Sequence, residues 1–176
     1  MDEYLGLKYK GTITLNLFRG AEIETLPDGR HRHVPGTGEL VHTLTQPNVF
    51  LNVGKSWAIQ RLFDDTSAVV SGTAAQCFYV GTTTSGGTGA VAGDTTAANT
   101  EIARENFVYA SGAVGAMSAT ATFVSATANG ALTEAGIFAG VVTTSGDGVF
   151  VVRVRFNPVN KTAADTVQLK WDIALS

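Results

Sequence analysis

The chain has 176 residues, a length that predicts one compact domain with at most a small appended arm. Hydrophobic residues make up 44% and charged residues 15%, which argues for a packed core and against global disorder. The formal net charge of -3 argues against a basic surface for nucleic acid, and the 20 glycines argue against a helical bundle or coiled coil.

The first ten residues, MDEYLGLKYK, lack the apolar core of a secretory signal. No stretch of the chain approaches the roughly 18 consecutive apolar residues of a membrane span. The single cysteine, Cys77, excludes an internal disulfide and reads as a small core residue. We therefore expect a protein that is made in a reducing cytoplasm and has neither membrane nor nucleic acid as a partner.

The side-chain pattern of residues 1–45 predicts a pair of strands. Apolar and polar side chains alternate through residues 12–18, as in a strand with one buried face. Residues 39–45 are expected to pair with this strand across a polar excursion rich in turn residues. Residues 1–45 are thus interpreted as an N-terminal β arm or attachment hairpin.

One helix follows. Asn52 is a candidate N-cap, and Ile59, Leu62 and Phe63 have the i, i+3, i+4 spacing of one apolar stripe. These features predict a short helix over residues 53–63.

The rest of the chain reads as short strands separated by turns. Further β-prone runs cover residues 76–80, 106–110, 119–123, 137–143, 149–156 and 167–173. We expect a surface loop over residues 81–99, tight hairpin turns at Asn129-Gly130 and at residues 145–148, and a strand end at Asn157-Pro158.

These elements predict an all-β fold. About eight antiparallel strands and one short helix favour a β-sandwich of jelly-roll type. Residues 46–176 would form the body of the sandwich as one continuous domain.

Two motifs partly resemble known kinds of binding site, a phosphate-binding loop and a metal site, but each lacks a residue that such a site requires. Gly54-Lys55-Ser56 resembles the end of a phosphate-binding loop, yet the position of the first glycine holds Val49. His31 and His33 share one strand face and could contact a metal or a neighbouring subunit, but no third ligand lies nearby in sequence. A solvated hairpin tip is the favoured interpretation of the histidine pair.

Glu134 is the most informative charged residue, because it lies between the apolar residues Leu132 and Ile137. A carboxylate in such a setting needs a cationic partner, and Arg104 or Arg153 could supply it. We interpret Glu134 as part of a structural ion pair. Arg153 and Arg155 share one strand face, and for these two we also expect a salt bridge between subunits. No nucleophile, base or paired carboxylates are arranged for catalysis, so we predict neither catalytic residues nor a cofactor.

Several segments from about residue 48 onward resemble small structural proteins of tailed bacteriophages, described as capsid-decoration, head-fibre or tail-fibre-like proteins. The matching segments are residues 48–62, 78–82 with 93–95, 101–104, 132–138 and 152–167. The segments LTEAGIF and NKTAADT carry most of the resemblance, whereas the first 45 residues do not share in it.

The resemblance implies a non-enzymatic component of the virion, assembled in the bacterial host cytoplasm. It implies a homotrimer or another symmetric assembly, docked on a major capsid, neck or tail protein. An exterior head-decoration or cement subunit is the leading interpretation. A tail, neck or collar fibre and a receptor- or carbohydrate-binding module are the alternatives. A sugar site would call for exposed aromatic rings, but Trp57 and Trp171 lie on faces predicted to be buried.

Overall fold

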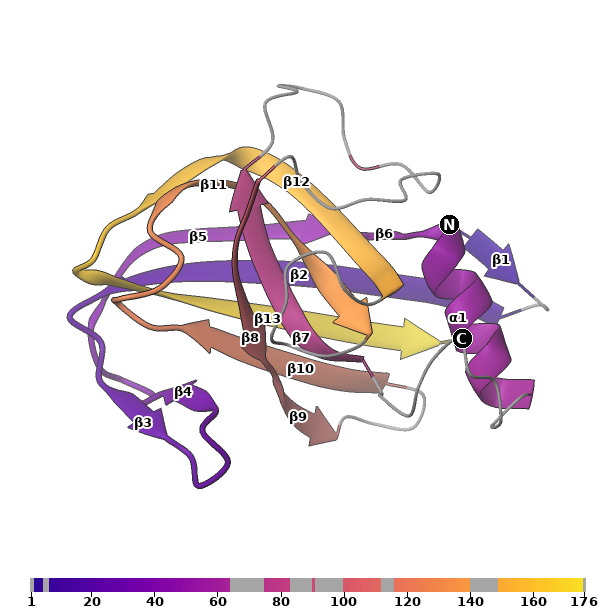
Figure 1. The fold of residues 1–176 in the computed structure, drawn as a ribbon, viewed down its shortest axis with the longest axis horizontal. Coiled ribbons are helices and arrows are strands. Elements are labelled where there is room, and N and C mark those ends of the chain that lie inside the picture. The colour runs from indigo at the N-terminus through magenta and orange to yellow at the C-terminus, as the bar shows by residue number, and fades with distance from the viewer. Residues whose placement is uncertain are drawn as a thin grey trace. The chain divides into compact units, whose positions relative to one another are not determined.

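The computed structural model describes residues 2–4, 7–63, 75–82, 90, 100–111, 116–139 and 149–175. Two antiparallel sheets, of six and five strands, carry the fold, together with one short helix and a small hairpin (Figure 1). The prediction of an all-β fold is confirmed. The described residues divide into thirteen strands rather than about eight, because several are only two to four residues long.

The chain divides into two compact units that alternate along the sequence. The first unit comprises Met1–Asn48, Phe107–Asn129 and Lys161–Ser176, and the second comprises Val49–Asn106 and Gly130–Asn160. The first junction lies close to the boundary predicted after residue 45. The residues before that junction share their unit with two later segments of the chain.

The six-stranded sheet belongs to the first unit and is organised around β2 (Leu7–Arg19). Its other strands are β1 (Asp2–Tyr4), β5 (Glu39–Pro47), β9 (Val108–Ser111), β10 (Ala116–Phe123) and β13 (Asp165–Leu175). On one side β2 pairs with β13, so that a strand near the start of the sequence lies beside one near its end (Figure 1). On the other side it pairs with β5, as predicted, and with β1.

One face of this sheet is apolar in three rows that cross β2, β13 and β10. The rows are Ile13–Trp171–Ala119, Leu15–Leu169–Ala121 and Leu17–Val167–Phe123. Each of these side chains is at most 4% exposed. The period-two pattern of the sequence therefore places large and small side chains opposite each other, which fills the space above the sheet.

The excursion between β2 and β5 contains a hairpin of β3 (Ile23–Thr25) and β4 (His31–His33). Strand β4 packs against β10. Arg30 reaches from the hairpin and donates a hydrogen bond to the Phe107 carbonyl at 2.9 Å. The excursion is thus tied to the sheet of its own unit.

The five-stranded sheet belongs to the second unit and has the order β6 (Val49–Phe50), β12 (Val149–Lys161), β11 (Gly130–Ala139), β7 (Ala75–Thr82), β8 (Thr100–Asn106). Consecutive residues 134–139 of β11 are all buried, so both faces of this strand are covered. Leu51, Tyr79, Phe138 and Phe150 form an apolar cluster in this unit, with Val49 and Val53 packed against it.

Helix α1 (Asn52–Phe63) begins at the predicted cap. The Leu51 N–H donates to the Val151 carbonyl at 3.0 Å, which ties the start of the helix to β12. A Cβ at Gly54 would lie 2.6 Å from the Val151 Cα, so only glycine permits this approach. Close packing therefore accounts for the glycine of the Gly54-Lys55-Ser56 motif. Among the described residues, no helix has the length and apolar character that a membrane crossing requires.

Two turn predictions are wrong. Asn129-Gly130 does not close a hairpin, because β10 and β11 belong to different sheets. Pro158 does not end a strand. It occupies an exposed position within β12, and this strand continues to Lys161. Turn residues are equally suited to a hairpin and to a crossover, so the local pattern could not separate the two. Most of the loop expected over residues 81–99, and the turn expected at residues 145–148, lie outside the described residues.

Candidate functional site

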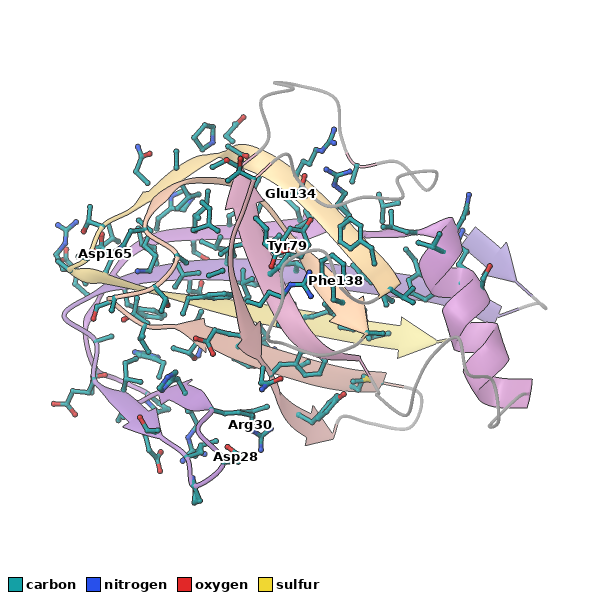
Figure 2. The ribbon with its side chains drawn as sticks, in the orientation of Figure 1. Asp28, Arg30, Tyr79, Glu134, Phe138 and Asp165 are labelled. Atoms are coloured by element: carbon teal, nitrogen blue, oxygen red, sulfur yellow. The ribbon has the colours of Figure 1, made fainter. Side chains whose placement is uncertain are left out.

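The Glu134 carboxylate is the centre of a buried polar cluster in the second unit (Figure 2). It accepts hydrogen bonds from the Tyr79 hydroxyl and from the Arg153 guanidinium. Arg155 Nε donates a third bond, at 3.3 Å. Glu134 is 0% exposed and Arg153 is 3% exposed, so this ion pair is almost entirely removed from water.

The sheet order explains these partners. Glu134 lies on β11, and Arg153 and Arg155 lie on the adjacent β12. Tyr79 lies on β7, on the other side of β11, opposite Gly136. The carboxylate therefore receives donors from both neighbouring strands, as a buried charge requires.

Arg104, the other predicted partner of Glu134, is placed elsewhere. It lies on the edge strand β8, opposite Tyr79, and forms an ion pair with Glu101, to which its Nη2 donates at 2.9 Å. Its guanidinium carbon also lies 4.0 Å from the centre of the Phe138 ring, in a cation–π contact. Arg104 thus belongs to a second ion pair in the same sheet.

Burial and charge both hold the Tyr79 hydroxyl in its neutral form. Burial first, and then the adjacent Glu134 carboxylate, raise the pKa of the Tyr79 phenol well above its ordinary value. In its neutral form the Tyr79 phenol keeps its proton and donates a hydrogen bond to the Glu134 carboxylate. The cluster is therefore suited to stabilising the sheet rather than to transferring protons.

Glu105 occupies a different environment on β8. It lies opposite Phe78, which in turn lies opposite Ile137, so the carboxyl group borders an apolar row of the sheet. Burial raises the pKa of Glu105 to about 7. No hydrogen bond or ion pair to this carboxyl group is found within the part of the chain that the structure describes.

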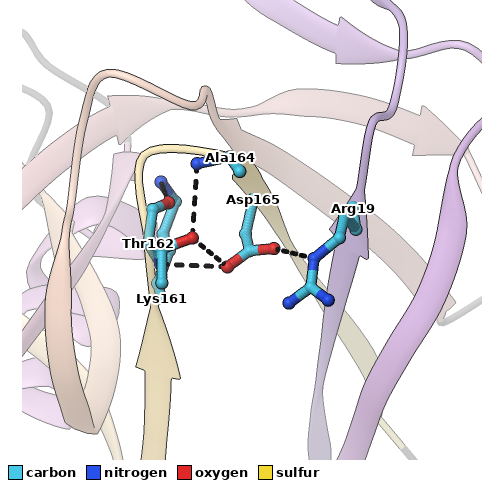
Figure 3. Close-up of polar contacts among 5 residues, drawn as sticks. All are labelled: Arg19, Lys161, Thr162, Ala164 and Asp165. Atoms are coloured by element: carbon cyan, nitrogen blue, oxygen red, sulfur yellow. Dashed lines mark hydrogen bonds and ion pairs between the residues drawn. The ribbon is translucent and has the colours of Figure 1, made fainter.

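A second polar network lies in the first unit, at the turn between β12 and β13 (Figure 3). The Thr162 N–H and hydroxyl both donate to Asp165 Oδ2, at 3.0 and 2.6 Å, while Arg19 Nε donates to Asp165 Oδ1 at 3.2 Å. The Thr162 hydroxyl, its N–H and the Arg19 guanidinium hold the pKa of Asp165 below its ordinary value. The network joins the turn to β2, at the end where β2 and β13 pair.

Lys161 completes this corner of the first unit. Its ammonium donates to Asn129 Oδ1 at 3.0 Å, to the Ser125 carbonyl at 3.3 Å and to the Thr162 carbonyl at 3.4 Å. Burial lowers the pKa of the Lys161 amine. Sequence reasoning did not find this role, because the Thr-x-x-Asp spacing of residues 162–165 is a signal for the start of a helix, whereas here it stabilises a turn between two strands.

The two candidate metal ligands, His31 and His33, make contacts with different residues. His33 is buried, stacks on Phe18 with ring centres 4.1 Å apart, and forms a hydrogen bond from Nε2 to the Thr37 carbonyl at 2.9 Å. His31 lies in a hydrogen bond with the Thr25 hydroxyl at 3.3 Å. Within the described residues, no three His, Cys, Asp or Glu side chains are grouped to hold a metal.

The second face of the six-stranded sheet carries hydroxyl and amide groups. Cross-strand rows on this face are Pro47–Thr12–Asp172–Ser118, Thr45–Thr14–Lys170–Thr120 and Thr43–Asn16–Gln168–Thr122. Several side chains are joined across strands, as in the Thr43 bond to Asn16 Oδ1 at 2.7 Å. Lys170 and Asp172 neutralise each other at 3.0 Å and are half-exposed.

Both edge regions of this sheet expose apolar side chains. The exposed large hydrophobic residues of the described chain are Leu40 and Val41 on β5, at 52% and 41%, and Tyr109 on β9, at 50%. β5 pairs with β2 on one side, and β9 pairs with β10. The sheet therefore presents a weakly charged face, with Lys10 and the Lys170–Asp172 pair among its charges, between two apolar edges, a surface suited to contact with another protein.

Comparison of the chain with protein-family models, with curated proteins and with solved structures found no match.

Proposed function

We propose that the protein is a non-enzymatic structural subunit of a tailed-phage virion. Its leading role is exterior head decoration, in which copies associate with each other and dock on the particle. The identification with a virion depends on the sequence resemblance, above all on residues 132–138 and 160–166. The structure supplies independent support for a role in assembly.

The observation that carries the proposal is the surface of the six-stranded sheet. Among the described residues, the exposed charges on the face with Thr14 and Thr45 include Lys10 and the Lys170–Asp172 pair, and most of its other side chains are uncharged. The edge strand β5 exposes Leu40 and Val41. Burying hydroxyl and amide groups against a partner costs less desolvation free energy than burying charges, provided that the groups keep hydrogen-bond partners in the interface. A subunit that works by burying area needs a surface of this kind.

The buried polar groups also support a structural role. Glu134 and Asp165 are 0% and 1% exposed, and each is held by an arginine and by hydroxyl donors. Carboxylates that are buried and paired in this way are typical of structural interactions.

The alternatives differ in where the subunit docks. A tail, neck or collar fibre would use the same sheet surface, so location on the particle is the deciding observation. A carbohydrate-binding module is less well supported, because Trp171 is 4% exposed and does not offer its ring to a sugar. The side chain of Trp57 lies outside the described residues.

Immunogold electron microscopy tests the proposal. An antibody raised against the purified chain would be applied to particles produced by the host that carries its gene, and excess free protein would serve as the blocking control. Label on the head supports decoration, and label on the neck or tail supports the fibre alternative. Intact particles that carry the chain nowhere would overturn the virion assignment.

A further inference from the structure

Strand β5 is an edge of the six-stranded sheet. Within the described residues it pairs with β2 and with no other strand. It is nine residues long, whereas strands of about five or six residues are typical. Its outer side therefore presents a long row of backbone N–H and C=O groups that a further strand could pair with.

The chemistry of β5 lacks most of the usual protection of an edge. Exposed edges are commonly guarded by lysine, by central prolines or by inward-pointing charges. Between Glu39 and Pro47 the strand reads LVHTLTQ and contains none of these. A register shift opposite Leu17 and Phe18 distorts the start of β5, but residues 42–47 pair regularly with β2.

A second copy of the chain fits this edge better than an unrelated segment does. Antiparallel pairing of β5 with itself about a two-fold axis at Thr43 would place Thr43 opposite its own symmetry mate. It would place His42 opposite Leu44 and, past the bulge at Val41, bring Val41 close to Thr45. No like charges then face each other, and β-branched side chains alternate along the contact. A two-fold contact of this kind is the commonest way in which identical subunits associate.

We propose that the free edge of β5 pairs with β5 of a second copy in antiparallel register, so that the six-stranded sheet continues from one subunit into the next. This inference rests on the proposed function, because it names the partner through which the subunit assembles. A single strand pair buries less than the about 1,600 Å² of a standard interface. The expected dimer is therefore weak in solution and strengthened on a particle, where many copies are held close together.

Sedimentation velocity and light scattering over a range of concentrations test the contact. The wild-type chain is expected to show a monomer–dimer equilibrium. Val41→Lys places two lysines at the contact and is expected to weaken dimerisation by at least about tenfold. Tyr109→Lys makes the same kind of change on β9 and should leave the dimer intact. Circular dichroism confirms that each variant folds.

Disulfide trapping tests the register independently. Thr43→Cys places two thiols opposite each other across the proposed axis, at a separation that permits a disulfide. Mild oxidation should give a covalent dimer of this variant. The wild type, with Cys77 alone, and Ala110→Cys on β9 serve as controls and should remain uncrosslinked.

The outcomes separate this inference from the proposed function. An oligomer of any size that Val41→Lys leaves unchanged, and that Thr43→Cys does not crosslink, overturns pairing through β5 but leaves assembly standing. A wild-type chain that stays monomeric at all concentrations, without crosslinking of Thr43→Cys, overturns the β5 pair. Failure of gold label to reach any particle overturns the virion role, whatever the state of the free protein.

Discussion

Arg153 and Glu134 form an ion pair between neighbouring strands of the five-stranded sheet, with only 4% and 0% of their side chains exposed. Such a pair has lost the hydration of both charges, and it is maintained by mutual attraction and by hydrogen bonds to the remaining oxygen. Tyr79 supplies that hydrogen bond. Stability therefore depends on both charged partners being present.

Replacing Glu134 with glutamine tests this dependence. The change leaves the Arg153 guanidinium buried without a countercharge, which typically costs about 3–5 kcal/mol of unfolding free energy. Urea denaturation, followed by circular dichroism, would measure the loss.

The matched control replaces both partners at once. Glu134→Leu combined with Arg153→Met removes both charges and keeps most of the volume, so the double variant should lose less stability than Glu134→Gln does. A Glu134→Gln variant as stable as the wild type would show that the pair is not needed.

The sequence predicts that Glu134 has a cationic partner, but it does not predict which arginine that partner is. The apolar neighbours of Glu134 signalled that a cation must lie near it, and the sequence offered Arg104 and Arg153 equally. Only the sheet order separates them, because β12 is adjacent to β11 whereas β8 lies beyond β7. Sheet order depends on contacts between distant parts of the chain, which leave no local pattern. The same reason explains why Arg153 and Arg155 were expected between subunits but pair within the chain.

The strands themselves were more accessible to prediction. Alternating side chains mark β2 and β13 because each has one polar and one apolar face. Their pairing could not be predicted, since Arg19 and Asp165, which lie opposite each other, are far apart in sequence. In β12, by contrast, Val151 and Val152 are both buried, so burial on both faces weakens the alternation.

Gly136 is predicted to be irreplaceable by alanine. A Cβ at this position would lie 2.5 Å from Tyr79 Cε1 and 2.9 Å from Phe150 Cε2, and it would also press on the Val152 carbonyl oxygen. Because that oxygen belongs to the backbone, no change of rotamer relieves the conflict. Gly136→Ala should therefore cost about 1–3 kcal/mol or more in urea denaturation.

Gly20→Ala provides the comparison for this variant. Gly20 has a φ of +63°, and no atom lies within 4 Å of the place that an alanine methyl group would take, so its replacement adds backbone strain without a clash. Near-ultraviolet circular dichroism should change for Gly136→Ala, which disturbs the rings of Tyr79 and Phe150, and not for Gly20→Ala. Equal spectra for the two variants would contradict the packing argument.

Asp165 links stability to acid pH. Its pKa is held below the ordinary value of 3.8 by the Thr162 hydroxyl, the Thr162 N–H and Arg19. The unfolded chain therefore binds a proton at a higher pH than the folded chain does. The resulting stabilisation is present above about pH 4 and is lost as the pH falls through the folded pKa.

Asp165→Asn should remove this contribution. We expect a loss of about 1–3 kcal/mol at neutral pH and a smaller difference from the wild type as the pH falls below about 4. Asp172→Asn is the control, since Asp172 is half-exposed in its pair with Lys170 and should cost no more than about 1 kcal/mol. A difference between Asp165→Asn and the wild type that does not vary with pH would contradict the argument.

Glu105 is expected to give stability the opposite dependence on pH from Asp165. Burial raises its pKa from 4.5 to about 7, so the folded chain keeps a proton that the unfolded chain has already released. Stability from this group is therefore complete below pH 4.5 and falls as the pH rises towards 7.

Glu105→Gln removes the penalty of burying this charge and should raise the melting temperature by about 2–4 °C at about pH 8, with little change at about pH 4.5. Glu24→Gln, at a half-exposed carboxylate paired with Arg32, should show no such rise. A difference between variant and wild type that is flat from about pH 4.5 to about pH 8 would show that Glu105 is solvated in the folded chain.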